Sequence, residues 1–203
     1  MKINEVLIKE IPTYADPSQF YAGGGKDLYQ EFRKTFPKLP EKVADDIWHQ
    51  KQPGKDPLVT NQLKKGVEAS KAFISYFTGR LFSAGGGDPL TGLTSEQLEK
   101  VLLEAIWQSR MLEVNPASFT EHSRNKMIKR NFGSAPGEDP VRIKRAGMSN
   151  DPVTLIESTQ QGGYIMWEGW HRTMVKLKSG SDGTNNYANW DPVKLRAWVA
   201  RVP

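Results

Sequence analysis

Residues 164–177, YIMWEGWHRTMVKL, decide the fold that this sequence predicts. The apolar run YIMW favours a strand, whereas Met174 and Leu177 recur at helical spacing. Glu168 and Gly169 lie between the two patterns and predict a tight turn, because glycine adopts backbone conformations that other residues avoid. The stretch therefore predicts a strand, a turn and a helix that begins directly after Gly169.

The first turn of this helix is a candidate phosphate site. A helix N-terminus has unpaired backbone N–H groups and a partial positive charge, and both attract anions. His171 and Arg172 add side-chain donors, and Gly169 leaves room for a phosphate. Cations here oppose the helix dipole, which is unusual for a purely structural turn. The alternative is structural: His171 caps or packs, and Arg172 pairs with an acidic neighbour, namely Glu157, Glu168 or Asp151.

Two more strands are predicted around this unit. Residues 153–156, VTLI, form an apolar run, and Gly162 and Gly163 predict the turn that joins it to residues 164–167. Residues 193–200, VKLRAWVA, show the alternation of a third strand, and residues 141–146 suit a short helix or a strand. Aromatic bulk is expected to fill the core of this small module, which holds four of the six tryptophans, Trp167, Trp170, Trp190 and Trp198.

In order and spacing, these elements resemble the core of the ParB/sulfiredoxin-like superfamily. The resemblance covers residues 151–203, with residues 3–11 as a further strand. It implies a phosphate-gripping turn and the start of its helix at Gly169, Trp170, His171, Arg172 and Thr173. The family includes sulfiredoxins, nucleotide-hydrolysing partition proteins, free-serine kinases and ParB-like nucleases. Sulfiredoxin activity is excluded, because Trp170 stands where those enzymes have their catalytic cysteine.

A nucleotide-dependent phosphotransferase or phosphohydrolase is the first function that this resemblance implies. Its cofactor would be ATP or CTP, and phosphoryl transfer usually also needs Mg²⁺ and a carboxylate that orients the nucleophile. Glu168 ranks first as that carboxylate, Glu157 and Asp151 follow, and His171 is a further catalytic candidate. No cysteine and only three separated histidines predict no dedicated metal site. The sequence leaves open whether the chain is an enzyme.

Residues 26–132 are predicted to be helical and to complete an α+β fold. Residues 1–25 hold the candidate strand and an irregular connection, residues 26–132 a helical region, and residues 133–203 the αβ module. Gly85–Gly87 and Gly133 are helix stops, and capping-box patterns begin at Thr94 and Ser118. The expected helices span residues 28–36, 40–50, 57–81, 94–114 and 118–131. This region is expected to pack on a small mixed sheet and to wall the phosphate site.

The net charge of +5 suggests a second function. The whole excess lies in residues 123–147, which carry Arg124, Lys126, Lys129, Arg130, Arg142, Lys144 and Arg145 against two acidic residues. Such a stretch suits a DNA-binding protein or a nuclease that follows the phosphate backbone, and it also suits a solvated helix face. A third hypothesis is a noncatalytic bacteriophage accessory protein. No membrane span or signal peptide is recognised, so we expect a cytoplasmic location, in the host for a phage protein.

Overall fold

The computed structural model describes residues 25–51, 57–81, 91–130, 140–160, 162–181 and 187–202. In these ranges the chain is an α+β protein with a four-stranded mixed sheet, which agrees with the predicted class. The strand predicted at residues 3–11 lies outside the described residues. The helices before the sheet are α1 (Gly25–Thr35), α2 (Glu41–Lys51), α3 (Pro57–Lys64), α4 (Ala69–Leu81) and α5 (Ser95–Leu103).

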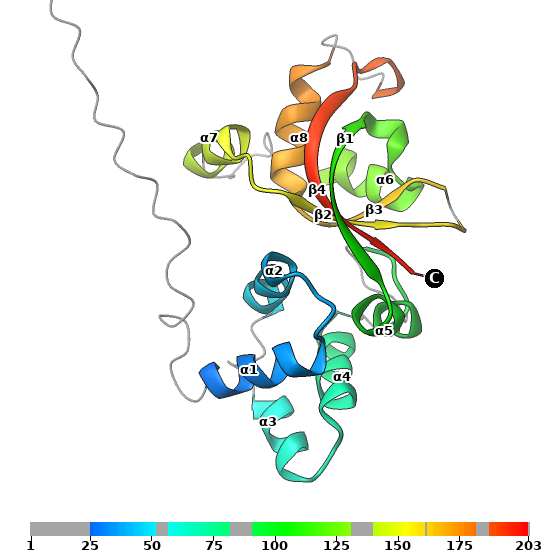
Figure 1. Ribbon diagram of the computed structural model, residues 1–203. Coiled ribbons are helices and arrows are strands. Elements are labelled where there is room, and N and C mark those ends of the chain that lie inside the picture. Colours follow the sequence, from blue (N-terminus) through cyan, green and yellow to red (C-terminus); the bar gives the residue numbers. More distant parts are fainter. Residues whose placement is uncertain are drawn as a thin grey trace, which may run out of the picture.

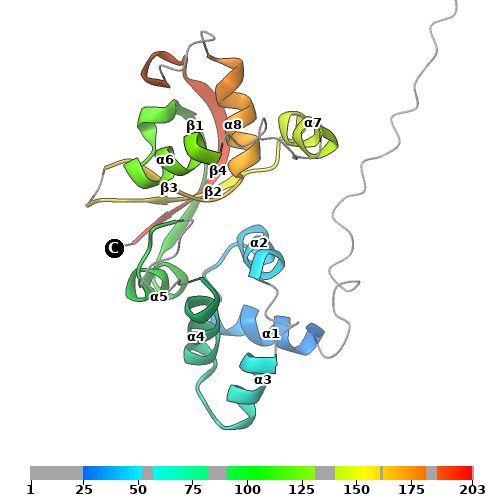
Figure 2. The same cartoon turned by 180° about the vertical axis from the view of Figure 1, so that it is seen from behind.

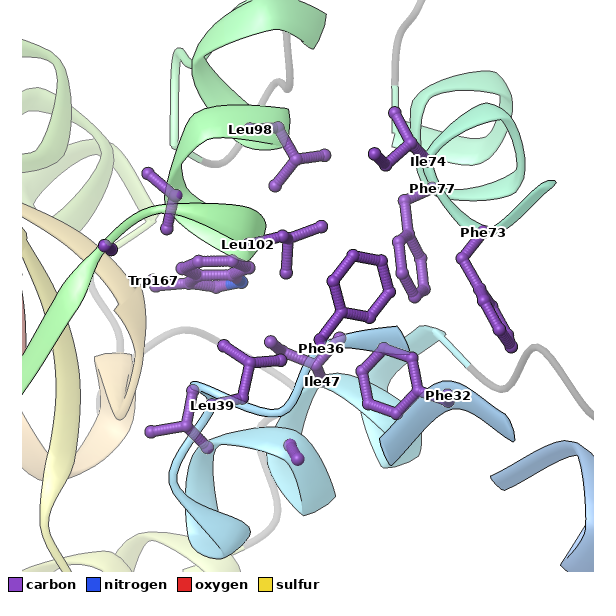
Figure 3. Packing of buried hydrophobic residues seen from close by; sticks show 14 of the residues in the cluster. Phe32, Phe36, Leu39, Ile47, Phe73, Ile74, Phe77, Leu98, Leu102 and Trp167 are labelled. Carbon is purple, nitrogen blue, oxygen red and sulfur yellow. The ribbon is translucent and has the colours of Figure 1, made fainter. Parts of the chain in front are cut away.

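An aromatic core holds these five helices together. Phe32 of α1 and Phe36, the residue after α1, contact Phe73 of α4, with ring centroids 5.4 and 6.1 Å apart. Figure 3 shows leucines of α5 reaching the same cluster, to which Ile47 of α2 also belongs. Apolar residues at helical spacing on each helix therefore meet in one core.

The prediction of one helix over residues 57–81 is wrong, because the chain turns at Gly66. The backbone of Gly66 has φ +77°, a conformation that glycine adopts without strain. Its N–H donates to Leu63 O at 2.9 Å, and Val67 N donates to Gln62 O at 3.0 Å. This pair of bonds is the Schellman termination of a helix. Gly66 therefore ends α3 instead of lying inside one long helix.

The all-helical prediction for residues 26–132 is also wrong, because it contains a strand. Thr94 and Gln97 form the expected capping box of α5, but α5 ends at Leu103. Strand β1 (Ile106–Val114) follows and pairs along its whole length with β4 (Val193–Arg201). Pairing with a strand almost ninety residues away overrides the local helical pattern, and residues 106–114 alone do not reveal that partner.

The second predicted capping box is displaced as well. Ser118 pairs with Asn115 at the ends of a 3-10 helix, η3 (Pro116–Ser118), rather than with Glu121. Helix α6 (Glu121–Arg130) begins after Thr120, whose Oγ1 accepts from Ser123 N at 3.4 Å. The basic helix is therefore present, three residues later than its predicted start.

The three strands predicted from the C-terminal part are confirmed. They are β2 (Val153–Glu157), β3 (Tyr164–Glu168) and β4. The sheet has the order β1-β4-β2-β3, with β2 parallel to β4 and the other pairs antiparallel. Gly162 and Gly163, both with positive φ, form the turn between β2 and β3. The remaining elements are α7 (Pro140–Met148), α8 (Trp170–Ser179) and a 3-10 helix, η4 (Tyr187–Asn189).

Helices cover both faces of the sheet (Figures 1 and 2). We call one the α8 face, because its core joins α6 and α8 to Val153, Leu155, Met166, Leu195, Ala197 and Val199. We call the other the α2 face, because α2 lies below it in Figure 1. Its buried residues Ile156, Ile165, Trp167 and Ala200 belong to the aromatic core of α1–α5. Helix α7 packs on α8, where Gly147 approaches Val175.

Candidate functional site

The turn between β3 and α8 has the predicted geometry. Gly169 is the N-cap of α8 with φ +97°, and no side chain caps the helix. A Cβ on Gly169 would lie 2.4 Å from Val153 Cγ1. Close packing on β2 thus requires a glycine here, in addition to the positive φ. The conformation expected at this turn is present, and packing alone is enough to explain it.

Arg172 forms an ion pair with Glu168, one turn earlier in the chain. Its Nη2 also donates to Pro152 O at 3.3 Å, whereas the buried Nε has no hydrogen-bond partner. The sequence analysis left three acidic residues open as partners of Arg172, and in the structure the partner is Glu168. A bound phosphate would therefore share Arg172 with this carboxylate or take it over.

Helix α2 contributes a second ion pair that the sequence analysis missed, between Lys42 and Asp46. Asp46 is 7% exposed, and its buried Oδ2 has no hydrogen-bond partner. Asp46 interacts electrostatically with both Glu168 and Arg172, so the two ion pairs form one group. We call Lys42, Asp46, Glu168 and Arg172 the charge cluster. A lysine and an aspartate four residues apart resemble an ordinary surface pair, and no sequence signal links them to residues 168–172.

Burial raises the pKa of both carboxyl groups in the charge cluster. For Glu168 desolvation is the largest cause, the charge of Arg172 opposes it, and that of Asp46 adds to it. For Asp46 desolvation is again the largest cause, and the hydrogen bond and charge of Lys42 oppose it. A carboxylate with a raised pKa is a stronger base than an ordinary one, and such groups often occur at functional sites.

A few oxygen atoms near the turn between β3 and α8 are candidate metal ligands. Thr154 lies opposite Glu168 in the sheet, and its buried Oγ1 has no hydrogen-bond partner. Within the described ranges, no group of three or more His, Cys, Asp or Glu residues could hold a metal ion. Mg²⁺ sites in enzymes that act on phosphates often use one or two protein carboxylates, with the substrate phosphates as further ligands. Glu168 and Asp46 fit a site of this type only.

Two predicted acidic residues lie outside the charge cluster. Glu157 is at the other end of β2, opposite Tyr164, and accepts two hydrogen bonds from Arg201 at 2.9 and 3.0 Å. This pairing lowers the pKa of Glu157. Asp151 is exposed before β2. The structure therefore does not bring either residue to Glu168 and Arg172.

The other predicted phosphate ligands differ in their surroundings. Trp170 is buried, and its Nε1 donates to Trp167 O at 3.2 Å. Thr173 is fully buried, with its hydroxyl 4.0 Å from Met166 Sδ. Both side chains thus pack in the interior. His171 is half-buried in the first turn of α8, on the same turn as Arg172.

The basic residues gather on a layer of three helices. Figures 1 and 2 both show α8 between α7 and α6, and we call these three helices the basic layer. Lys144 and Arg145 of α7 are exposed, and Arg124 and Lys126 of α6 are half-buried. Lys129, Arg130 and Arg142 belong to the same helices. Helix α8 adds two residues that the sequence analysis missed, Lys176 and Lys178. Glu121 is the one acidic residue in these three helical segments.

Comparisons with protein-family models, with curated proteins and with solved structures returned no match to this chain. Within the described residues, no helix is long and apolar enough to cross a membrane.

Proposed function

We propose that this protein binds a nucleotide through its phosphates at the first turn of α8 and acts as a phosphotransferase or phosphohydrolase. The observation that supports this best is the pairing of Arg172 with Glu168 beside an N-cap that no side chain occupies. An arginine there can bind a phosphate together with backbone N–H groups. The resemblance of this turn to the ParB/sulfiredoxin-like superfamily supports the same ligand, ATP or CTP.

The neighbouring carboxyl groups supply the chemistry that such a reaction needs. When a phosphate takes Arg172, Glu168 is released from its ion pair and can accept the proton of the attacking hydroxyl or water. Its raised pKa favours this role. With Glu168 as the base, Asp46 is the carboxylate that would hold Mg²⁺, which would neutralise charge on the phosphates. His171, on the same turn, is a further donor to a phosphate.

Direct titration with ATP, CTP and ADP, with and without Mg²⁺, tests the nucleotide site. We expect Arg172→Ala to weaken binding at least tenfold, and Arg172→Lys to weaken it less, because the charge remains. Arg201→Ala is the matched control, since Arg201 also pairs with a glutamate but lies away from α8. Circular dichroism would confirm that each variant is folded. Equal affinity of the wild type and Arg172→Ala would refute the proposal, as would failure of the wild type to bind any nucleotide.

The basic layer favours nucleic-acid binding as a second candidate function. Three neighbouring helices with many cations and a single carboxylate suit contact with several phosphates along a backbone. The affinity for a DNA duplex should then fall steeply as salt rises from about 50 to 200 mM. The exposed pair Lys144→Glu with Arg145→Glu should weaken binding at least tenfold.

The control for the basic layer has the same charge change elsewhere. Lys64 and Lys65 are exposed at the end of α3, so Lys64→Glu with Lys65→Glu alters the net charge equally. If both double variants lose affinity to the same extent, the binding reflects net charge rather than the basic layer. Unchanged affinity in the α7 variant would exclude α7 from the interface.

A further inference from the structure

Within the described part of the chain, strand β1 leaves one edge of the sheet open. It pairs with β4 over nine residues, and no described residue forms a backbone hydrogen bond along its other side. The opposite edge is closed: Thr120 N donates to Tyr164 O at 3.0 Å, and Ser123 Oγ accepts from Met166 N at 3.0 Å. An unpaired strand of this length is a template on which a further strand can add.

Two exposed side chains of β1 are apolar and lie among exposed polar ones. Ile106 is 56% exposed and Met111 is 65% exposed. They point to opposite faces of the sheet, because their numbers differ by five and side chains alternate along a strand. The register with β4 contains no bulge, and β1 contains no proline. Sheet edges are usually protected by such features.

We propose that β1 pairs antiparallel with β1 of a second copy of this chain, with Ser109 on the two-fold axis. In this register Ile106 lies opposite Leu112 of the second copy. Trp107 likewise lies opposite Met111 of the second copy, so both exposed apolar residues gain apolar neighbours. Cross-strand pairs of this kind stabilise a sheet. The two copies then share one continuous eight-stranded sheet.

The charges on β1 select this register. With the axis at Ser109, Arg110 faces Gln108 of the second copy, a pair that already bonds within the strand at 3.0 Å. An axis at Arg110 would place two arginines directly opposite each other, which is unfavourable. An axis at Met111 would leave Ile106 without a partner in the second strand, and an axis at Gln108 would do the same to Met111.

A single introduced cysteine tests both the dimer and its register, because the chain has no cysteine of its own. Residues directly opposite have Cβ atoms roughly 4.5–5.5 Å apart, close to disulfide geometry, whereas diagonal neighbours are about 7–8 Å apart. Ser109→Cys should therefore form a disulfide-linked dimer under mild oxidation. Gln108→Cys, whose counterpart is diagonal, should crosslink at least tenfold more slowly. Ser179→Cys, exposed at the end of α8, is the distant control.

Sedimentation of the uncrosslinked chain gives the second measurement. The wild type should sediment as twice its mass of 22.8 kDa at micromolar concentration. Met111→Lys should raise the dissociation constant of the dimer at least tenfold, because a charge replaces the apolar contact. A monomeric wild type would overturn the proposal. So would a dimer that Met111→Lys leaves intact, or crosslinking at 109 that is no faster than at 108.

Discussion

Buried polar atoms without a hydrogen-bond partner occur on both faces of the sheet, but more of those that the structure describes lie toward α2 than on the α8 face, where His122 Nε2 of α6 is one. Ser123 bonds to Met166 N, and the Trp170 indole bonds to Trp167 O. Toward α2, in contrast, Asp46 Oδ2, Trp107 Nε1 and Thr154 Oγ1 have no hydrogen-bond partner. Unpaired buried polar atoms are costly, so they often mark a place where function constrains the sequence. The concentration of such atoms toward α2 supports a functional role for the charge cluster, which joins α2 to the first turn of α8.

The largest expected effect comes from removing the indole through which the α2 face of the sheet packs on the aromatic core of α1–α5. Trp167 is 5% exposed, contacts Trp107 with ring centroids 6.3 Å apart, and belongs to the aromatic core (Figure 3). Trp167→Ala should lower the unfolding free energy by about 3–5 kcal/mol. Urea unfolding would measure it, followed by tryptophan fluorescence and circular dichroism. Coincident transitions are expected, and separate ones would mean that the helices and the sheet unfold independently.

The next effect tests whether the charge cluster acts as a unit. Lys42→Met leaves the buried carboxyl of Asp46 without its cation and should cost about 1–3 kcal/mol. Removing one partner of a fully buried ion pair lowers the unfolding free energy by about 3–5 kcal/mol. We expect a smaller effect here because the Lys42 side chain is 24% exposed. Asp46→Asn in addition should recover much of the loss, because it removes the unpaired charge. A double-mutant cycle measures this coupling, and strict additivity of the two changes would argue against it.

The pH dependence of stability sharpens the same comparison. Burial raises the pKa of Asp46 and Glu168, so the folded protein keeps protons that the unfolded chain releases. Their contribution to the unfolding free energy is fully present below their ordinary pKa values, about 4, and is lost as the pH rises through the raised values. The double variant Asp46→Asn, Glu168→Gln should gain stability relative to the wild type between pH 4 and pH 8. A difference in unfolding free energy between variant and wild type that stays constant over this range would contradict the raised pKa values.

The same contrast explains how much the sequence could predict. Residues 153–179 follow local rules, since glycines with positive φ punctuate short apolar runs, and the predicted strands and helix are present. Strand β1 was missed because its partner is distant in sequence. Asp46 was missed because burial, rather than spacing, distinguishes it from a surface aspartate. Local conformation was predictable, whereas the contacts that assemble the charge cluster depend on the packing of α2 against the sheet.

The smallest expected effect concerns the two glutamates at opposite ends of the hairpin formed by β2 and β3. Glu157 and Arg201 form an exposed pair, with side chains 28% and 55% exposed, so solvent screens their interaction. Glu157→Gln should lower the unfolding free energy by only about 0.2–1 kcal/mol, and by less at high salt. It should leave nucleotide affinity unchanged, whereas Glu168→Gln should alter it, because only Glu168 shares the arginine that binds the phosphate. Calorimetric titration of both variants makes the comparison. An equal effect of the two substitutions would remove the reason to prefer Glu168 over Glu157 as the reacting carboxylate.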